Sequence, residues 1–195
     1  MRTHMTKAAA LLLAMAGIAA TSAPPHITPT VVITKQADAI KAGIPGATQF
    51  FVRTVTIGED DFQALSEGGF RPDEEAVKFY YGQSANGTLQ GVMVFPQVNT
   101  TQHGPLEIGL ALAPDGTVRS VAVTKATVET KPWVQAAVAS GLLQRFAGMR
   151  AGADARSALS AVSKDAIGDM PYYVAGLIAQ DVARGLAYYQ ALYAE

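Results

Sequence analysis

Large apolar residues alternate with polar or small ones in two parts of the chain, a pattern that predicts two β-hairpins. The first comprises residues 76–82 and 88–96, and its turn contains Asn86-Gly87, which supplies the left-handed backbone that a tight connection needs. The second turns at residues 114–116, before a strand that begins near Thr117. Residues 49–58, rich in aromatic and β-branched side chains, predict a further strand.

Apolar residues spaced by three and four predict helices that flank these strands. A short helix follows Thr34, which would cap it, and ends near Gly43, and a second helix covers residues 59–68. A third is predicted over residues 132–146, and the longest over residues 171–193. The expected fold is therefore α+β, a mostly antiparallel twisted sheet of two hairpins with flanking helices and a long C-terminal helix.

The first strand of the second hairpin has two unlike faces. One face carries large apolar side chains, and the other carries Glu107, Gly109, Ala111 and Ala113. Small side chains along a strand have two explanations, a helix packed close to the sheet or a flat ligand lying on it. The sequence leaves both open.

The first 23 residues have the composition of an export signal. Arg2 and Lys7 flank the start of the segment, and an uncharged apolar run and small residues up to Ala23 follow. The run holds about a dozen residues, fewer than the ~20 of a spanning helix. We expect a signal peptide at residues 1–23, cleaved or kept as an anchor, an extended leader at 24–33 and a single domain at 34–195. The mature chain would have no transmembrane segment and would lie in the periplasm or another extracytoplasmic space.

Charge and cysteine content exclude several classes of partner and site. The chain has 15 basic and 16 acidic residues, and without Arg2 and Lys7 the balance is 13 to 16, a net charge of −3. No excess of basic residues remains for binding nucleic acid. Because there is no cysteine, disulfides, iron–sulfur clusters and a thiol nucleophile are excluded.

Conventional catalytic signals are missing from the sequence. There is no Walker loop, no Gly-x-Ser-x-Gly elbow, no dinucleotide fingerprint and no His-x-x-x-His pair. Of the three histidines, only His103 lies next to a predicted strand. A lone histidine there is more typical of a structural or surface residue than of a ligand or base. We therefore predict no catalytic residue and no metal site.

The segment after the second hairpin gathers side chains suited to a ligand. It carries Lys125, Glu129, Thr130, Lys131 and Trp133 just before a predicted helix, whose start presents free backbone N–H groups and a partial positive charge. This set suits an anionic ligand with a flat aromatic part. Periodicity alone favours the simpler interpretation, in which Thr130 caps the helix and Trp133 is its first core residue.

The sequence HGPLEIGLALAPDGTVRSVAVTKATVETKPW, together with the order of predicted elements over about residues 34–192, resembles the FMN-binding domain family. This family includes the G subunit of Rnf-type electron-transport complexes and the C subunit of sodium-pumping quinone reductase. Glu129-Thr130-x-Pro132 is similar to the family's turn near the flavin. The resemblance implies Lys125 or Lys131 at the phosphate, Glu129 and Thr130 as hydrogen-bonding groups, and Trp133 or His103 against the ring.

The family's second hallmark is a C-terminal run whose threonine carries FMN through a phosphoester in many members. The matching segment here is KDAIGDMPYY, in which Lys164, Asp165 and Gly168 stand in the approach to that run and are expected to border the cofactor. Asp169 and Met170 replace its last residues, and a methionine cannot form the bond. By this resemblance, residues 125–133 form one wall of a cleft and residues 165–173 the other.

These observations predict an exported, FMN-binding electron-transfer domain that holds its flavin non-covalently and serves a membrane-bound or periplasmic redox partner. Such a domain would be an electron-transfer module rather than an independent catalyst. The alternative is a flavin-free member of the same family, which binds another ligand or a partner segment in the cell envelope. A third and weaker hypothesis is haem, with His103 and Met170 as axial ligands.

Overall fold

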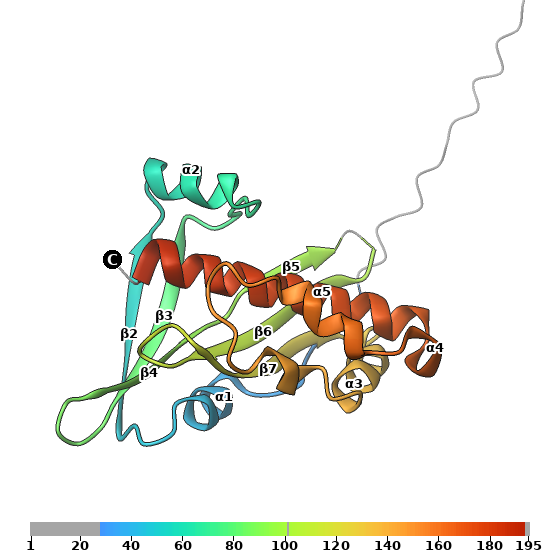
Figure 1. Cartoon of the computed structure of the whole chain (residues 1–195), viewed down its shortest axis with the longest axis horizontal. Coiled ribbons are helices and arrows are strands. Elements are labelled where there is room, and N and C mark those ends of the chain that lie inside the picture. Colours follow the sequence, from blue (N-terminus) through green and yellow to red (C-terminus); the bar gives the residue numbers. More distant parts are fainter. Residues whose placement is uncertain (1–27, 101, 194–195) are drawn as a thin grey trace, which may run out of the picture.

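A seven-stranded antiparallel sheet forms the centre of the structure (Figure 1). The computed structural model describes residues 28–100 and 102–193, so the predicted signal peptide lies outside the described residues. The strand order is β1-β7-β6-β4-β3-β2, and β5 also pairs with β6. The strands are β1 (Thr30–Val32), β2 (Gln49–Thr56), β3 (Ala76–Gln83), β4 (Leu89–Val94), β5 (Gln97–Thr100), β6 (Gly104–Leu112) and β7 (Val118–Thr127).

Helices flank the sheet, and the predicted α+β fold is confirmed. Figure 1 shows the long helix α5 running across the sheet. The α-helices are α1 (Gln36–Gly43), α2 (Glu59–Glu67), α3 (Lys131–Ala139), α4 (Lys164–Ile167) and α5 (Asp169–Tyr188). Two 3₁₀ helices, η1 (Leu143–Phe146) and η2 (Ala155–Ala161), and a π-helical turn, η3 (Tyr189–Tyr193), complete the set. In the described part of the chain, no helix is both long and apolar enough to cross a bilayer.

Several element boundaries differ from the predicted ones. The N-cap residue of α1 is Lys35, and Thr34 does not cap the helix. The long helix begins at Asp169, two residues before the predicted start. The helix expected over residues 132–146 ends at Ala139, because Gly141 adopts a left-handed φ of 80° and the chain continues as η1. The sheet begins at Thr30, four residues before the expected boundary at Thr34, since β1 pairs with the end of β7. The last residues of the predicted leader are therefore part of the sheet.

The central strand β6 is buried on both faces. Its large residues join the main core with α5, which includes Ile178 and Val182. Its small face is covered by α1: a Cβ on Gly43 would lie 2.7 Å from Cβ of Ala111 and 2.5 Å from Cε of Met93. A close-packed helix, and not space for a flat ligand, therefore explains the small residues.

Pro96 lies between the strands β4 and β5 and separates them. β4 and β5 both pair with β6, and between them Pro96 accepts a hydrogen bond from the Ile108 backbone N–H (3.1 Å). The strand β3 pairs with β4 but not with β5, so within the described residues no strand covers the outer edge of β5. The guanidinium of Arg184, on α5, donates to the Gln97 carbonyl at this edge.

One carboxyl group of α5 points into the core. Asp181 is fully buried, and neither of its carboxyl oxygens has a hydrogen bond of good geometry within residues 28–100 and 102–193, although the Val98 backbone N–H lies close enough to lower the pKa of the group. Burial raises the pKa of Asp181 to about 8, Arg184 opposes the rise, and Glu74 and Glu107 add to it. Burial therefore favours the protonated, neutral form of this side chain well above the usual pKa of a carboxyl group.

We predict that Gly43→Ala destabilises the protein by about 1–3 kcal/mol, because the added methyl group would overpack the contact between α1 and β6. The matched control is Gly176→Ala in α5, where a Cβ meets no atom within 4 Å. That change should add about 0.5–1 kcal/mol through helix propensity. Urea unfolding of both variants measures the difference, and an equal response of the two would contradict the packing of α1.

We predict that Asp181 makes the protein less stable as the pH rises. The folded carboxyl keeps its proton up to about pH 8, whereas the unfolded group ionises near 3.8. The folded state thus binds more protons between these values, and the free energy of unfolding should fall across this window by at most about 1.4 kcal/mol per pH unit. Asp181→Asn, which cannot titrate, should flatten the slope. An unchanged slope in urea titrations from pH 4.5 to 8 would show that another group is responsible.

Candidate functional site

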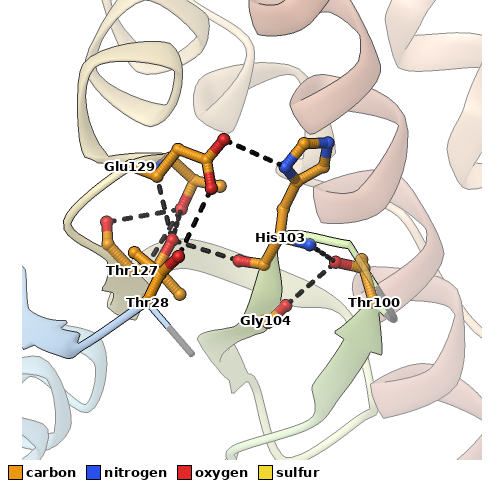
Figure 2. A network of polar contacts seen from close by, with 7 residues as sticks. Thr28, Thr100, His103, Gly104, Thr127 and Glu129 are labelled. Atoms are coloured by element: carbon orange, nitrogen blue, oxygen red, sulfur yellow. Dashed lines mark hydrogen bonds and ion pairs between the residues drawn. The ribbon is translucent and has the colours of Figure 1, made fainter. Parts of the chain in front are cut away.

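Three chain segments meet around the His103 side chain. His103 ends the β5–β6 turn, Glu129 lies in the β7–α3 turn, and Trp133 and Tyr173 come from α3 and α5. The imidazole contacts Trp133 edge to face, with ring centroids 5.2 Å apart, and its centroid lies 6.1 Å from that of Tyr173. Its Nδ1 atom is 3.4 Å from Oε1 of Glu129 (Figure 2). This cluster is the candidate site.

Two threonines hold the β7–α3 turn to the β5–β6 turn. The Thr130 hydroxyl oxygen accepts from the Thr127 backbone N–H (3.0 Å) and lies 2.9 Å from the Thr127 hydroxyl. The Thr127 hydroxyl in turn donates to the His103 carbonyl (3.1 Å). Both threonines are buried. The strand β7 therefore runs beyond Val123 because its end is fixed by β1 and by this threonine pair.

The Thr100 hydroxyl stabilises the β5–β6 turn through two hydrogen bonds. The Thr100 hydroxyl accepts from the His103 backbone N–H (3.0 Å) and donates to the Gly104 carbonyl (3.1 Å). Gly104 has a left-handed φ of 73°, and a Cβ there would lie 2.8 Å from the Thr127 side chain. Figure 2 shows that both turns converge on the His103 backbone. The backbone that carries the imidazole is thus held by hydrogen bonds from both turns.

The side chains of the cluster are only partly covered. His103 is 19% exposed and Glu129 39%, and Glu129 Oε2 accepts from the Thr28 hydroxyl (3.4 Å). His103 Nδ1 is buried and makes no hydrogen bond of good geometry within the part of the chain that the structure describes, although Glu129 lies beside it. Tyr173 is 44% exposed, so an aromatic surface reaches solvent next to the imidazole. Such a surface suits a planar ligand.

Lys125, predicted at the phosphate, lies away from this cluster. Its ammonium group is 2.8 Å from the Glu107 carboxylate, which also accepts from Thr124 (2.7 Å) and Gln36 (3.0 Å). Glu107 is buried, and these partners compensate its charge. The β6–β7 pairing shifts register between Glu107 and Ile108, which sets Lys125 opposite Glu107. Lys125 is therefore part of a partly buried ion pair beside α1.

The second predicted wall lies at the start of α5. Lys164 and Asp169 form an exposed ion pair (3.0 Å), and the hydrogen bond and charge of Asp169 raise the pKa of Lys164. Gly168, with a left-handed φ of 90°, precedes α5, and no side chain caps the helix. Asp165 is exposed on α4. Lys131, at the start of α3, is exposed and forms no ion pair with any residue of the described ranges.

The structure brings together His103, Glu129 and Trp133, with Thr130 beneath them as part of the turn. It does not bring Lys125 to them. Sequence reasoning gave Tyr173 no individual role, although the expected second wall ended there. Thr127 was also missed, and its signal is the spacing of two threonines three residues apart just before a helix start. Comparison of the chain with protein-family models, curated proteins and solved structures finds no match.

We predict that Thr130→Val destabilises the protein by about 1–3 kcal/mol, since it leaves the buried Thr127 backbone N–H without its acceptor. Thr88→Val, at an exposed threonine of the β3–β4 turn whose side chain makes no hydrogen bond in the described structure, is the matched control and should change stability little. Denaturant unfolding compares the two. Equal effects would mean that the threonine pair does not stabilise the turn.

Proposed function

We propose that the protein is an exported, FMN-binding electron-transfer domain and that it holds FMN non-covalently at the His103 cluster. The observation that supports this most is the convergence of Trp133 and Tyr173 on His103. They lie beside the Glu129-Thr130 turn, where the resemblance to the FMN-binding family expects the flavin. When bound, the isoalloxazine ring would supply the redox chemistry, and the protein would supply binding and placement.

The residues of the cluster have distinct roles in this proposal. Trp133 and the exposed Tyr173 offer aromatic surface to the ring. Glu129 lies against Nδ1 of His103 and so orients the imidazole, while the Thr127–Thr130 pair fixes the turn that carries Glu129. Polar groups of the turn are thereby preorganised, which lowers the entropy lost when a ligand binds.

The phosphate of FMN would lie near the start of α5. This helix has 20 residues and no side-chain cap, so its first backbone N–H groups and its dipole favour an anion. The Asp169 carboxylate, which would repel a phosphate, is paired with Lys164, and Lys131 provides an exposed cation. Met170 stands where the family's acceptor threonine is expected and has no hydroxyl for a phosphoester, so the flavin must be exchangeable.

A second candidate function is a flavin-free module that binds another ligand or a partner segment in the cell envelope. The ion pairs formed by two lysines favour this second candidate. Lys125 and Lys164, two of the three predicted cations, are engaged in ion pairs, and the Thr130 hydroxyl is buried in the turn. Fewer groups than expected therefore remain for a phosphate. A membrane-bound or periplasmic redox partner belongs to the first proposal only.

We predict that the purified protein carries or takes up FMN and releases it on denaturation. The absorbance spectrum is recorded, the protein is unfolded and filtered, and the filtrate should contain all of the flavin.

Tyr173→Ala should weaken the binding of added FMN about tenfold, because aromatic contacts contribute roughly 0.5–1.5 kcal/mol. Lys131→Glu should also weaken it, with an unchanged melting temperature in the absence of ligand.

The matched control is Phe62→Ala, which removes an exposed aromatic ring from α2. It should bind FMN as the unaltered protein does. Flavin that stays with the denatured chain would contradict the assignment of Met170 to the acceptor position. A colourless protein that does not take up FMN would contradict the flavin proposal and support the flavin-free module. An absorbance band of haem would favour His103 as an axial ligand.

A further inference from the structure

The strand β2 is an open edge of the sheet. It lies at one end of the strand order, and β3 is its one partner among the described strands (Figure 1). Six consecutive residues from Gln49 to Thr54 are exposed, and three of them are large and apolar: Phe50 (40%), Phe51 (41%) and Val52 (55%). Natural edge strands are usually protected from pairing by charged side chains, proline, bulges or a short length, and Arg53 is the one charged residue of β2. β2 has eight residues, no proline and a regular register with β3.

We propose that β2 pairs antiparallel with β2 of a second copy of the chain, about a twofold axis at Val52, and so joins two sheets into one. This dimer is independent of the proposed flavin function. Twofold dimers are the commonest assemblies of soluble proteins, and each surface in them meets itself. Pairing of strand edges provides main-chain hydrogen bonds without the need for a deep groove.

The hydrogen-bond pattern of β2 restricts the possible registers. Ile57 N–H donates to the Glu75 carbonyl (2.9 Å), and this bond continues the register that pairs Val55 with Val77. In an antiparallel pair, hydrogen-bonded and non-bonded positions alternate along the strand. The odd-numbered residues of β2 therefore bond to β3, and the N–H and C=O groups of Phe50, Val52 and Thr54 point to the open edge. A second β2 must place these even-numbered residues opposite one another.

Three symmetric registers meet this condition near the strand centre, with the axis at Phe51, Val52 or Arg53. The axis at Arg53 sets two guanidinium groups directly opposite each other, which is unfavourable. The axis at Phe51 pairs only residues 49–53 within the strand. The axis at Val52 pairs residues 49–55, sets Val52 against Val52, and places Phe51 opposite the partner copy's arginine at position 53.

This central register also matches the side chains on the odd-numbered face. Phe51 stacks on Tyr81 with ring centroids 5.3 Å apart, and the Arg53 guanidinium lies 5.6 Å from the centre of the Tyr193 ring. A second copy would bring its arginine next to this aromatic pair, a cation–π arrangement made twice by the symmetry. Because Arg53 is the one charge of β2 and meets an aromatic ring in place of a like charge, the edge is complementary to itself.

The absence of cysteine provides a direct test of the register. Phe51→Cys, Val52→Cys and Arg53→Cys are made singly and oxidised under mild conditions. In a hydrogen-bonded pair the Cα atoms are about 5.5 Å apart, a separation that a disulfide can span. Val52→Cys should form the disulfide-linked dimer fastest. Fastest cross-linking through position 51 or 53 would overturn the central register.

The assembly itself is tested by light scattering of the full chain over a range of concentrations. The unaltered protein should show the mass of a dimer, and Val52→Lys, which sets two ammonium groups at the axis, should show a monomer with an unchanged melting curve at low concentration. The matched control is Val32→Lys, since Val32 is 62% exposed on β1 at the other edge of the sheet. It should remain a dimer. A monomeric unaltered protein, or equal dissociation of both lysine variants, would overturn the proposal. The open edge of β2 would then be a site for pairing with a strand of a different protein.

Discussion

The burial of β6 on both faces is the constraint on which the rest of the structure depends. A strand with both faces covered needs a packed element on each side, and here α5 meets the large residues while α1 meets the small ones. The same strand pairs with β7 on one edge and with β4 and β5 on the other. The two turns that carry His103 and Glu129 begin β6 and end β7, so their positions follow from this central packing.

Local patterns predicted much of the fold. The alternation from Leu106 to Leu112 predicted β6, and Asn86-Gly87 predicted the turn before β4, because both signals lie within a few residues. The break at Gly141 could not be placed from periodicity, which continues across it. β1 was missed for another reason: it has three residues and forms only because β7, about a hundred residues later, pairs with it.

The candidate site was likewise predicted only in part. The grouping of His103, Glu129 and Trp133 came from the resemblance to the FMN-binding family, whereas periodicity alone favoured a structural role for Thr130 and Trp133. The ion pair of Lys125 with Glu107 was not predicted, because it depends on the register shift beside Glu107, which the sequence does not reveal. The approach of Tyr173 depends on the angle at which α5 crosses the sheet, and that angle is set by packing over the whole length of the helix.

The contact between α1 and β6 has a consequence for how this sequence can diverge. The Cβ position of Gly43 is already occupied by the side chains of Met93 and Ala111, with Ser120 next in distance at 3.7 Å. A larger residue at any one of these sites requires a smaller one at another, because the helix cannot withdraw without uncovering β6. Positions 43, 93 and 111 should therefore covary among homologous chains, and this correlation would identify relatives in which helix and strand are packed at the same distance.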